Sequence, residues 1–179
     1  MLRKTALVII VSSIVFPRAI LGQDTSATAD RAHILSSARK LMEKARYCAL
    51  ITIGDDGQPQ ARVVDPFLPD EGMIIWIATN PASRKIAQIK KDARVTLYYL
   101  NPNKSGYVTI LGKADLIDVM AEKEKHWKEA WSFLYKDKYR GDDFTLIRVR
   151  PQRLEIVSYP DKLINDPKTW QPVQVVFPE

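Results

Sequence analysis

The chain has 179 residues, of which 46% are hydrophobic and 27% charged, a composition that predicts one soluble globular domain with a hydrophobic core. The net charge is +6, but Arg3, Lys4 and Arg18 lie in the first 22 residues, and the rest of the chain carries only +3. This small excess, without a basic patch interleaved with aromatic residues, argues against a nucleic-acid partner. The single cysteine, Cys48, excludes an internal disulfide, and its apolar sequence neighbours predict a buried, inert thiol.

Residues 1–22 have the features of a secretion signal peptide. A positively charged start is followed by an apolar stretch over residues 5–16, and small residues suitable for cleavage follow from Gly22 onward. The stretch is short for a membrane span. We therefore expect an exported protein, periplasmic or secreted, with no stable membrane span after cleavage. Arg18 is an awkward charge so near a cleavage site, and an uncleaved N-terminal anchor stays open as the alternative.

The first part of the mature chain is expected to form a helix and a hairpin. Apolar residues recur at helical spacing from Ile34 to Ala45, and Asp30 is a suitable cap. A Gly-Asp-Asp-Gly turn then separates two β-rich runs. In chain order, the expected elements are a polar and flexible lead-in over residues 23–32, a helix ending near residue 46, and strands over residues 48–53 and 60–65.

The stretch from residue 73 to residue 100 reads as strand, helix, strand, with Asn80 as the N-cap and Pro81 at the first helical position. Ser83, Arg84 and Lys85 then fall in the first turn of the helix. Two cations there oppose the helix dipole, and a bound phosphate would reverse that conflict. The alternative is that both cations are ordinary solvated helix residues.

The second half of the chain is expected to be mainly β. A long strand over residues 107–117 contains Gly112, which indicates a bulge. The elements expected after it are a helix over residues 119–135, a charged loop over 136–143, strands over 144–149 and 154–159 joined by a turn at 150–153, and a proline-rich tail over 160–179 that holds Trp170 and a short strand near 173–177. Six or seven strands joined mostly by tight turns predict a mainly antiparallel, closed or nearly closed β-barrel with helices outside.

Several kinds of chemistry are excluded by what the sequence lacks. The two histidines, His33 and His126, and the one cysteine cannot build a zinc finger or a histidine-rich metal site. A haem-ligating histidine would have to be one of these two, and each reads as an ordinary helix residue. There is no nucleophile elbow, P-loop or dinucleotide-binding glycine motif, and no pair of carboxylates stands out as an acid–base couple.

Over residues 36–159 the chain resembles the FMN-binding split-barrel family related to pyridoxamine 5′-phosphate oxidase, and especially the small general-stress-protein branch. The resemblance implies a split barrel that binds flavin over residues 33–159. It rests on short motifs in the family's order: Ala49-Leu50-Ile51-Thr52, Gly57-Gln58-Pro59-Gln60-Ala61-Arg62-Val63-Val64, Ile77-Ala78-Thr79-Asn80, Ser83-Arg84-Lys85, Ala93-Arg94-Val95-Thr96-Leu97 and Tyr107-Val108-Thr109-Ile110-Leu111-Gly112.

This resemblance implies an FMN site at the interface of a homodimer. Arg62, Ser83, Arg84 and Lys85 would lie at the flavin phosphate. The residues implied along the flavin ring or ribityl chain are Val63, Val64, Ala78 and Thr79, and Tyr107 would reach the flavin from the partner subunit. A polar amide stands at the Tyr107 position in pyridoxamine phosphate oxidases, so this residue departs from the family pattern.

The resemblance favours a flavin-dependent oxidoreductase that acts on an unidentified small molecule. No histidine follows His126, so the Arg and His segment that grips the substrate phosphate in pyridoxamine phosphate oxidases is missing, and vitamin B6 oxidation is not expected. Two alternatives remain open: a non-catalytic flavin-binding or stress-related module, and a split barrel that holds a deazaflavin, haem or no cofactor. We identify no catalytic side chain and no metal ligand.

Overall fold

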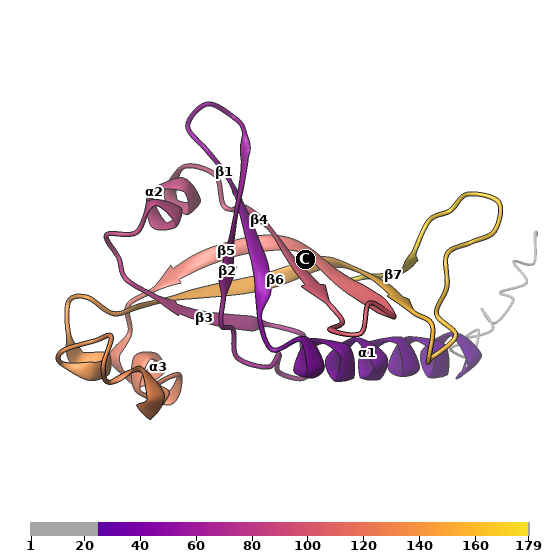
Figure 1. Ribbon diagram of the computed structural model, residues 1–179, viewed down its shortest axis with the longest axis horizontal. Coiled ribbons are helices and arrows are strands. Elements are labelled where there is room, and N and C mark those ends of the chain that lie inside the picture. The colour runs from indigo at the N-terminus through magenta and orange to yellow at the C-terminus, as the bar shows by residue number, and fades with distance from the viewer. Residues whose placement is uncertain (1–24, 179) are drawn as a thin grey trace, which may run out of the picture.

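The computed structural model describes residues 25–178, so the expected signal peptide lies outside the described residues. The first element is helix α1 (Thr25–Ala45), which runs along one side of a β-sheet (Figure 1). Residues 25–32, expected as a flexible lead-in, are therefore helical, and Asp30 lies inside the helix. Three alanines in this segment explain the earlier start, since alanine is the strongest helix former. Among the described helices, none is both long enough and apolar enough to cross a membrane.

Seven strands form one antiparallel sheet, which confirms the expected fold class. The strand order is β2-β1-β4-β5-β6-β3, with β7 also paired to β6. The strands are β1 (Cys48–Ile53), β2 (Pro59–Val64), β3 (Ile75–Thr79), β4 (Arg94–Leu100), β5 (Gly106–Ile117), β6 (Thr145–Ser158) and β7 (Val173–Val176).

The two outer strands of this order, β2 and β3, approach each other without forming a ladder. An isolated bridge joins Pro66 to Ile77, and the Phe67 amide donates to the Trp76 carbonyl at 2.8 Å. The sheet thus curves round until the segment after β2 reaches β3 through this single bridge, and it stays open elsewhere along β2 and β3, which is consistent with a split barrel. The consequence for the site is that the end of β2 and the end of β3 lie side by side.

β6 is one strand of 14 residues, and this corrects the expectation of two strands joined by a turn at residues 150–153. Leu111 pairs with Arg153 and Gly112 with Pro151, so Gln152 is an extra residue in a β-bulge. A Cβ on Gly112 would lie 2.2 Å from the carbonyl oxygen of residue 150, which requires glycine there. Proline has no N–H to donate and is tolerated at a bulge. The bend that looked like a turn in the sequence is therefore absorbed within the strand.

The two shorter helices differ from expectation at their boundaries. Helix α2 (Arg84–Lys91) begins three residues after the proline expected at its start, and Ser83 is its N-cap residue. Asn80 instead accepts a hydrogen bond from the Ala82 amide at 2.8 Å, which forms a turn just before the helix.

The helix expected over residues 119–135 is much shorter. Helix α3 (Met120–Lys125) ends where His126 and Lys128 leave helical backbone angles, and two short 3-10 helices follow, η1 (Glu129–Trp131) and η2 (Lys138–Arg140). Lys128 makes an ion pair with Asp65 at 3.1 Å, and this tertiary contact accompanies the break. The aromatic residues after the break can therefore face the barrel instead of continuing a helix.

The core fills the barrel with the inward-facing residues of the strands, together with the apolar faces of α1 and α2. Cys48, at the start of β1, is 3% exposed, and burial raises the pKa of its thiol to about 12. The expectation of a buried thiol is thus confirmed. The tail after β6 returns as β7 and pairs with residues 153–156, while β3 pairs with residues 145–149 on the same edge of β6.

Candidate functional site

A cleft of about 200 Å³ lies where the ends of β2 and β3 meet the segment after α3. Five of the nine residues expected at a flavin site line it. The complete lining is Val63, Val64, Asp65, Ala78, Thr79, Lys85, Trp131, Leu134 and Tyr135. The fold thus gathers, on one wall, residues that come from two strands and a helix far apart in sequence.

The strand wall of the cleft is mainly apolar and is formed by the ends of β2 and β3. On β2, Val63 points outward and is 74% exposed, while Val64 is half-buried. Ala78 and Thr79 end β3, and the Thr79 hydroxyl lies 3.4 Å from the Ser83 hydroxyl in the turn that leads to α2. This wall offers small side chains, which leave room for a planar group.

Arg62 is held at one end of the cleft by a polar network on β1 and α2. Its guanidinium donates to the Thr52 hydroxyl at 2.5 Å, the Gln88 side-chain oxygen at 2.9 Å and the Leu50 carbonyl at 3.3 Å. Gln88 is 4% exposed and also donates to Gln60 at 2.8 Å. All the partners of Arg62 are neutral, so the network fixes the position of its charge without cancelling it.

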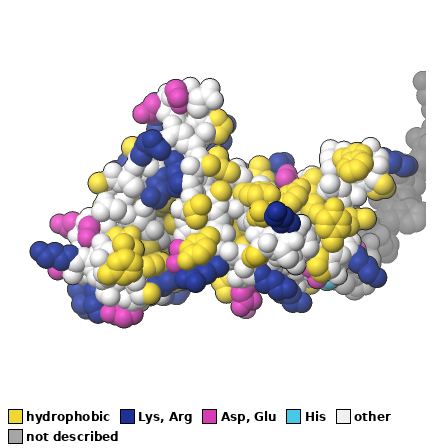
Figure 2. Space-filling model, in the orientation of Figure 1, with side chains coloured by type: hydrophobic (Ala, Val, Ile, Leu, Met, Phe, Trp, Pro, Cys, Tyr) yellow, Lys and Arg dark blue, Asp and Glu magenta, His cyan; other side chains and the backbone are white. Residues whose placement is uncertain are grey.

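Three cations meet at this end of the cleft. Burial lowers the pKa of Lys85, and repulsion from Arg62 lowers it further. Burial likewise lowers the pKa of Arg62, with a second contribution from Arg84. Within residues 25–178, none of the three forms an ion pair with a carboxylate. Figure 2 shows dark blue side chains gathered where α2 faces the β1–β2 hairpin.

The backbone adds to this positive end. Arg84 and Lys85 are the first two residues of α2, where N–H groups lack partners within the helix and the dipole is positive. Ser83 makes no side-chain capping bond, so its hydroxyl does not occupy these donors. A phosphate fits this arrangement because it accepts hydrogen bonds from the free amides and relieves repulsion among the three cations.

Tyr107 lies apart from the cleft. It is on the outer face of β5, opposite Leu100, and its ring centroid is 5.6 Å from that of Tyr98. Burial raises the pKa of the Tyr107 phenol, with smaller contributions from Glu155 and Tyr98. Within one chain, the structure therefore brings eight of the nine expected residues to one region and leaves Tyr107 on the outside of the barrel.

Sequence reasoning missed the wall of the cleft that lies opposite the strands. Trp131, Leu134 and Tyr135 form that wall, and Asp65 ends the strand wall. Trp131, Leu134 and Tyr135 fall within residues 119–135, which were expected to form a single helix. The useful clue would have been the number of aromatic residues in a short segment with no second helix to pack against.

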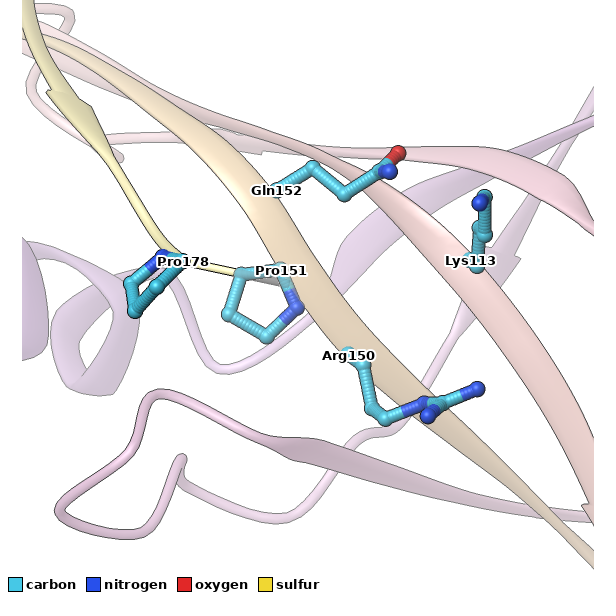
Figure 3. A pocket seen from close by; sticks show the side chains of 5 residues that line it. All are labelled: Lys113, Arg150, Pro151, Gln152 and Pro178. Atoms are coloured by element: carbon cyan, nitrogen blue, oxygen red, sulfur yellow. The ribbon is translucent and has the colours of Figure 1, made fainter.

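A larger cavity of about 470 Å³ adjoins the cleft and shares Asp65 with it. The residues that line this cavity are Glu43, Arg46, Asp65, Pro66, Phe67, Leu68 and Lys128. A separate hollow of about 270 Å³ lies at the β5–β6 bulge, lined by Lys113, Arg150, Pro151, Gln152 and Pro178, and contains none of the expected site residues (Figure 3).

Neither histidine reaches the cleft. His126 is 7% exposed and stacks on Trp76 with ring centroids 4.2 Å apart, while His33 lies on α1 and contacts the Asp161 carbonyl at 3.4 Å. In the part of the chain that the structure covers, no cluster of His, Cys, Asp or Glu could hold a metal ion.

Comparison with known proteins agrees with this fold. The family model of pyridoxamine 5′-phosphate oxidase matches residues 34–158. No match is found among the curated proteins. A protein related to general stress protein 26 of Bacillus subtilis, from Clostridium acetobutylicum, is similar in structure, with a TM-score of 0.66 and 18% identity over 82% of this chain and 95% of that chain.

Further solved structures share the fold and differ in their ligands. General stress protein 26 from Bacillus anthracis gives a TM-score of 0.65 at 18% identity, covering 81% of this chain and 99% of that chain. A pyridoxamine 5′-phosphate oxidase-related, FMN binding protein from Nostoc punctiforme gives 0.54 at 17% identity, covering 84% and 96%. A heme binding protein and an F420 reductase are also similar to the chain, so the fold alone does not identify the cofactor.

Proposed function

The chain belongs to the pyridoxamine 5′-phosphate oxidase family, and from that premise we propose that it binds FMN and acts as a flavin-dependent oxidoreductase on a small molecule. One observation carries this proposal. Three cations without carboxylate partners among the described residues meet the N-terminus of α2 at one end of an apolar cleft. The FMN phosphate carries about −1.5 to −2 charges near neutral pH, which these three cations would balance.

Each group of residues has a distinct task in this proposal. Arg62, Arg84 and Lys85, with the Ser83 hydroxyl, would hold the phosphate. Val63, Val64, Ala78 and Thr79 would support the flat ring and the ribityl chain. Bound FMN would supply two-electron transfer to or from an organic molecule. The protein would orient that molecule and exclude water, since the cleft offers no histidine and its one carboxylate, Asp65, is paired with Lys128.

We propose further that the functional unit is a homodimer with the second copy on the outer face of the sheet. Apolar side chains lie there on β2 and β4, the two strands that flank β1, with Val63, Tyr98 and Leu100 between 36% and 74% exposed. Val63 also lines the cleft, so a copy seated on this face would cover the cleft and bring its own Tyr107 near it. Sedimentation that gives the monomer mass at micromolar concentration would contradict this arrangement.

The spectrum of the untreated purified protein tests the cofactor. We expect a yellow protein with a flavin spectrum, and the flavin should be released on denaturation and should rebind to the refolded chain. A deazaflavin or haem spectrum would show that the protein binds that cofactor and not FMN. A colourless protein that does not take up FMN would refute the proposal.

Turnover is tested separately on the flavin-loaded protein. Bleaching of the flavin by a nicotinamide donor, followed by recovery in air, would support the oxidoreductase. A flavin that stays bound and is neither reduced nor reoxidised at a useful rate would support the alternative, a flavin-binding module without turnover.

We also propose that residues 1–22 direct export, as their charged start and apolar stretch indicate. Fractionation of cells that express the full chain, with mass spectrometry of the purified product, tests this. A mature N-terminus at or after residue 23 in an extracytoplasmic fraction is expected. A full-length product in the membrane fraction would instead support an uncleaved anchor.

A further inference from the structure

The segment after α3 contributes three residues to the lining of the cleft, and two of them are aromatic. We define the aromatic wall as Phe67, Trp131, Leu134 and Tyr135. The rings of Phe67 and Trp131 meet edge to face with centroids 5.7 Å apart, and Leu134 is 58% exposed. The last three residues line the cleft, whereas Phe67 lines the adjoining 470 Å³ cavity, so the wall runs from one space into the other.

Lys128 lies against this wall and is already paired. The Lys128 ammonium lies 3.1 Å from the Asp65 carboxylate, 3.4 Å from the Pro66 carbonyl, and 4.7 and 4.8 Å from the ring centroids of Phe67 and Trp131. Its charge therefore serves to hold the aromatic wall against the end of β2. It is not available to a ligand unless Asp65 releases it.

The adjoining cavity carries no net charge. Besides the Asp65–Lys128 pair it contains Glu43 and Arg46, which have opposite signs, and its remaining lining residues are apolar. An ionised ligand would lose hydration against the aromatic wall. The cations outside the Asp65–Lys128 pair would compensate little, because Arg46 is exposed to solvent and Lys85 is assigned to the phosphate in the proposed function. A neutral ring loses little on transfer and gains stacking or edge contacts with the aromatic side chains.

We propose that the aromatic wall is the substrate side of the site and that it takes an uncharged, flat aromatic molecule. This inference rests on the proposed flavin function and adds the substrate class to it. It assigns Trp131 and Leu134 as specificity-determining residues, and Lys128 as a positioning residue that acts through the wall.

A pair of shape-matched probes tests the charge preference. The full chain loaded with FMN is titrated by calorimetry with 2-naphthamide, which is neutral, and with 2-naphthoate, which is anionic. We expect 2-naphthamide to bind at least tenfold more tightly. Equal affinity, or tighter binding of 2-naphthoate, would overturn the proposal.

Two neighbouring substitutions test the location. Leu134→Ser should weaken the binding of 2-naphthamide by about tenfold, because an apolar contact is replaced by a hydroxyl. Phe133→Ser is the matched control, since Phe133 is 82% exposed and does not line the cleft or the cavity. The control should bind like the unaltered protein, and an equal loss in both variants would place the ligand elsewhere.

A third variant tests the role of the ion pair by a gain of binding. Asp65→Asn keeps the shape of the side chain and frees the charge of Lys128, so 2-naphthoate should bind about fivefold more tightly while 2-naphthamide changes little. No gain for 2-naphthoate would show that Lys128 does not govern charge selection. FMN binding is measured first in every variant by quenching of flavin fluorescence. If FMN itself does not bind, the same titrations on the flavin-free chain still decide the ligand class.

Discussion

The two ends of the cleft handle positive charge in opposite ways. At the α2 end, Arg62, Arg84 and Lys85 lie together, and the pKa values of Arg62 and Lys85 are lowered by burial and by repulsion from a neighbouring cation. At the aromatic end, Lys128 lies in contact with Asp65 and between two rings. The cationic side chains at the α2 end thus have no carboxylate partner among the described residues, whereas Lys128 at the aromatic end is neutralised by Asp65. The difference indicates which end is built for an anion and which for a neutral ring.

The largest expected effect comes from removing the charge at the start of α2. The double variant Arg84→Ala with Lys85→Ala should weaken FMN binding by about 10² to 10⁴-fold, because each charge-assisted hydrogen bond contributes about 1.5–3 kcal/mol. Lys90→Ala with Lys91→Ala removes the same charge from the other end of the helix and should leave the affinity within about twofold. Fluorescence titration compares the two. An equal loss in both would show that only general charge attracts FMN.

Arg62 should give the next largest effect. Arg62→Ala should weaken FMN by about ten- to a hundredfold, and it should also lower the free energy of unfolding by about 1–3 kcal/mol, because Thr52 and Gln88 lose a partner while buried. Arg62→Lys keeps the charge and should recover much of the affinity. If Arg62→Ala binds FMN normally, Arg62 has only a structural role in the sheet. The phosphate site would then consist of the residues of α2 alone.

The pH dependence of FMN binding sharpens the comparison further. In the flavin-free protein the pKa of Lys85 is below its usual 10.5, so Lys85 loses its charge at a lower pH than an ordinary lysine. FMN affinity should therefore rise as the phosphate gains its second charge near pH 6 and fall again in the alkaline range below pH 10.5. Lys85→Arg should shift the alkaline fall to higher pH. An unchanged alkaline limb in that variant would exclude Lys85 as its cause.

The smallest effect is expected at the aromatic end. Asp65→Asn should lower the free energy of unfolding by only about 0.5–1 kcal/mol, since both side chains of the pair are partly exposed to solvent and to salt screening. Urea unfolding at low and high salt measures this. Asp55→Asn, which breaks the exposed pair with Lys91 in the hairpin turn, is the control and should cost less. A larger loss at Asp55 would contradict the assigned structural role of Lys128.

The sequence predicted the strands well where local pattern and tertiary structure agree. The β1–β2 hairpin forms around the Gly-Asp-Asp-Gly turn, with Gly57 at φ 77°. Gly112 marks a bulge, as its place within an apolar strand indicated. The family resemblance is confirmed by the family match and by the fold. Each of these features is encoded within a few neighbouring residues.

Two of the errors share one cause, which is that long-range contacts override local preference. Residues 150–153 have the composition of a turn, yet pairing with β5 on one side keeps them in a strand. Residues 126–128 fit a helical pattern, yet the Asp65–Lys128 pair and the packing of His126 on Trp76 accompany the end of α3. No window of sequence contains both partners of such contacts.

The same cause limited what could be said of the site. The positive end was predicted because its conflict with the helix dipole lies within one short segment, around Arg84 and Lys85. The aromatic wall was missed because Trp131 faces the cleft only after the helix has ended. The roles of all nine expected flavin-site residues remain predictions that the proposed variants can test.

The burial of Cys48 has a consequence for the chemistry of the whole molecule. With a thiol pKa of about 12, only on the order of one molecule in 10⁵ carries the reactive thiolate at pH 7. The folded chain is therefore almost inert to oxidants and to thiol–disulfide exchange. Since this is the only cysteine, copies of the folded protein cannot readily become covalently linked, and any lasting association between them must be non-covalent.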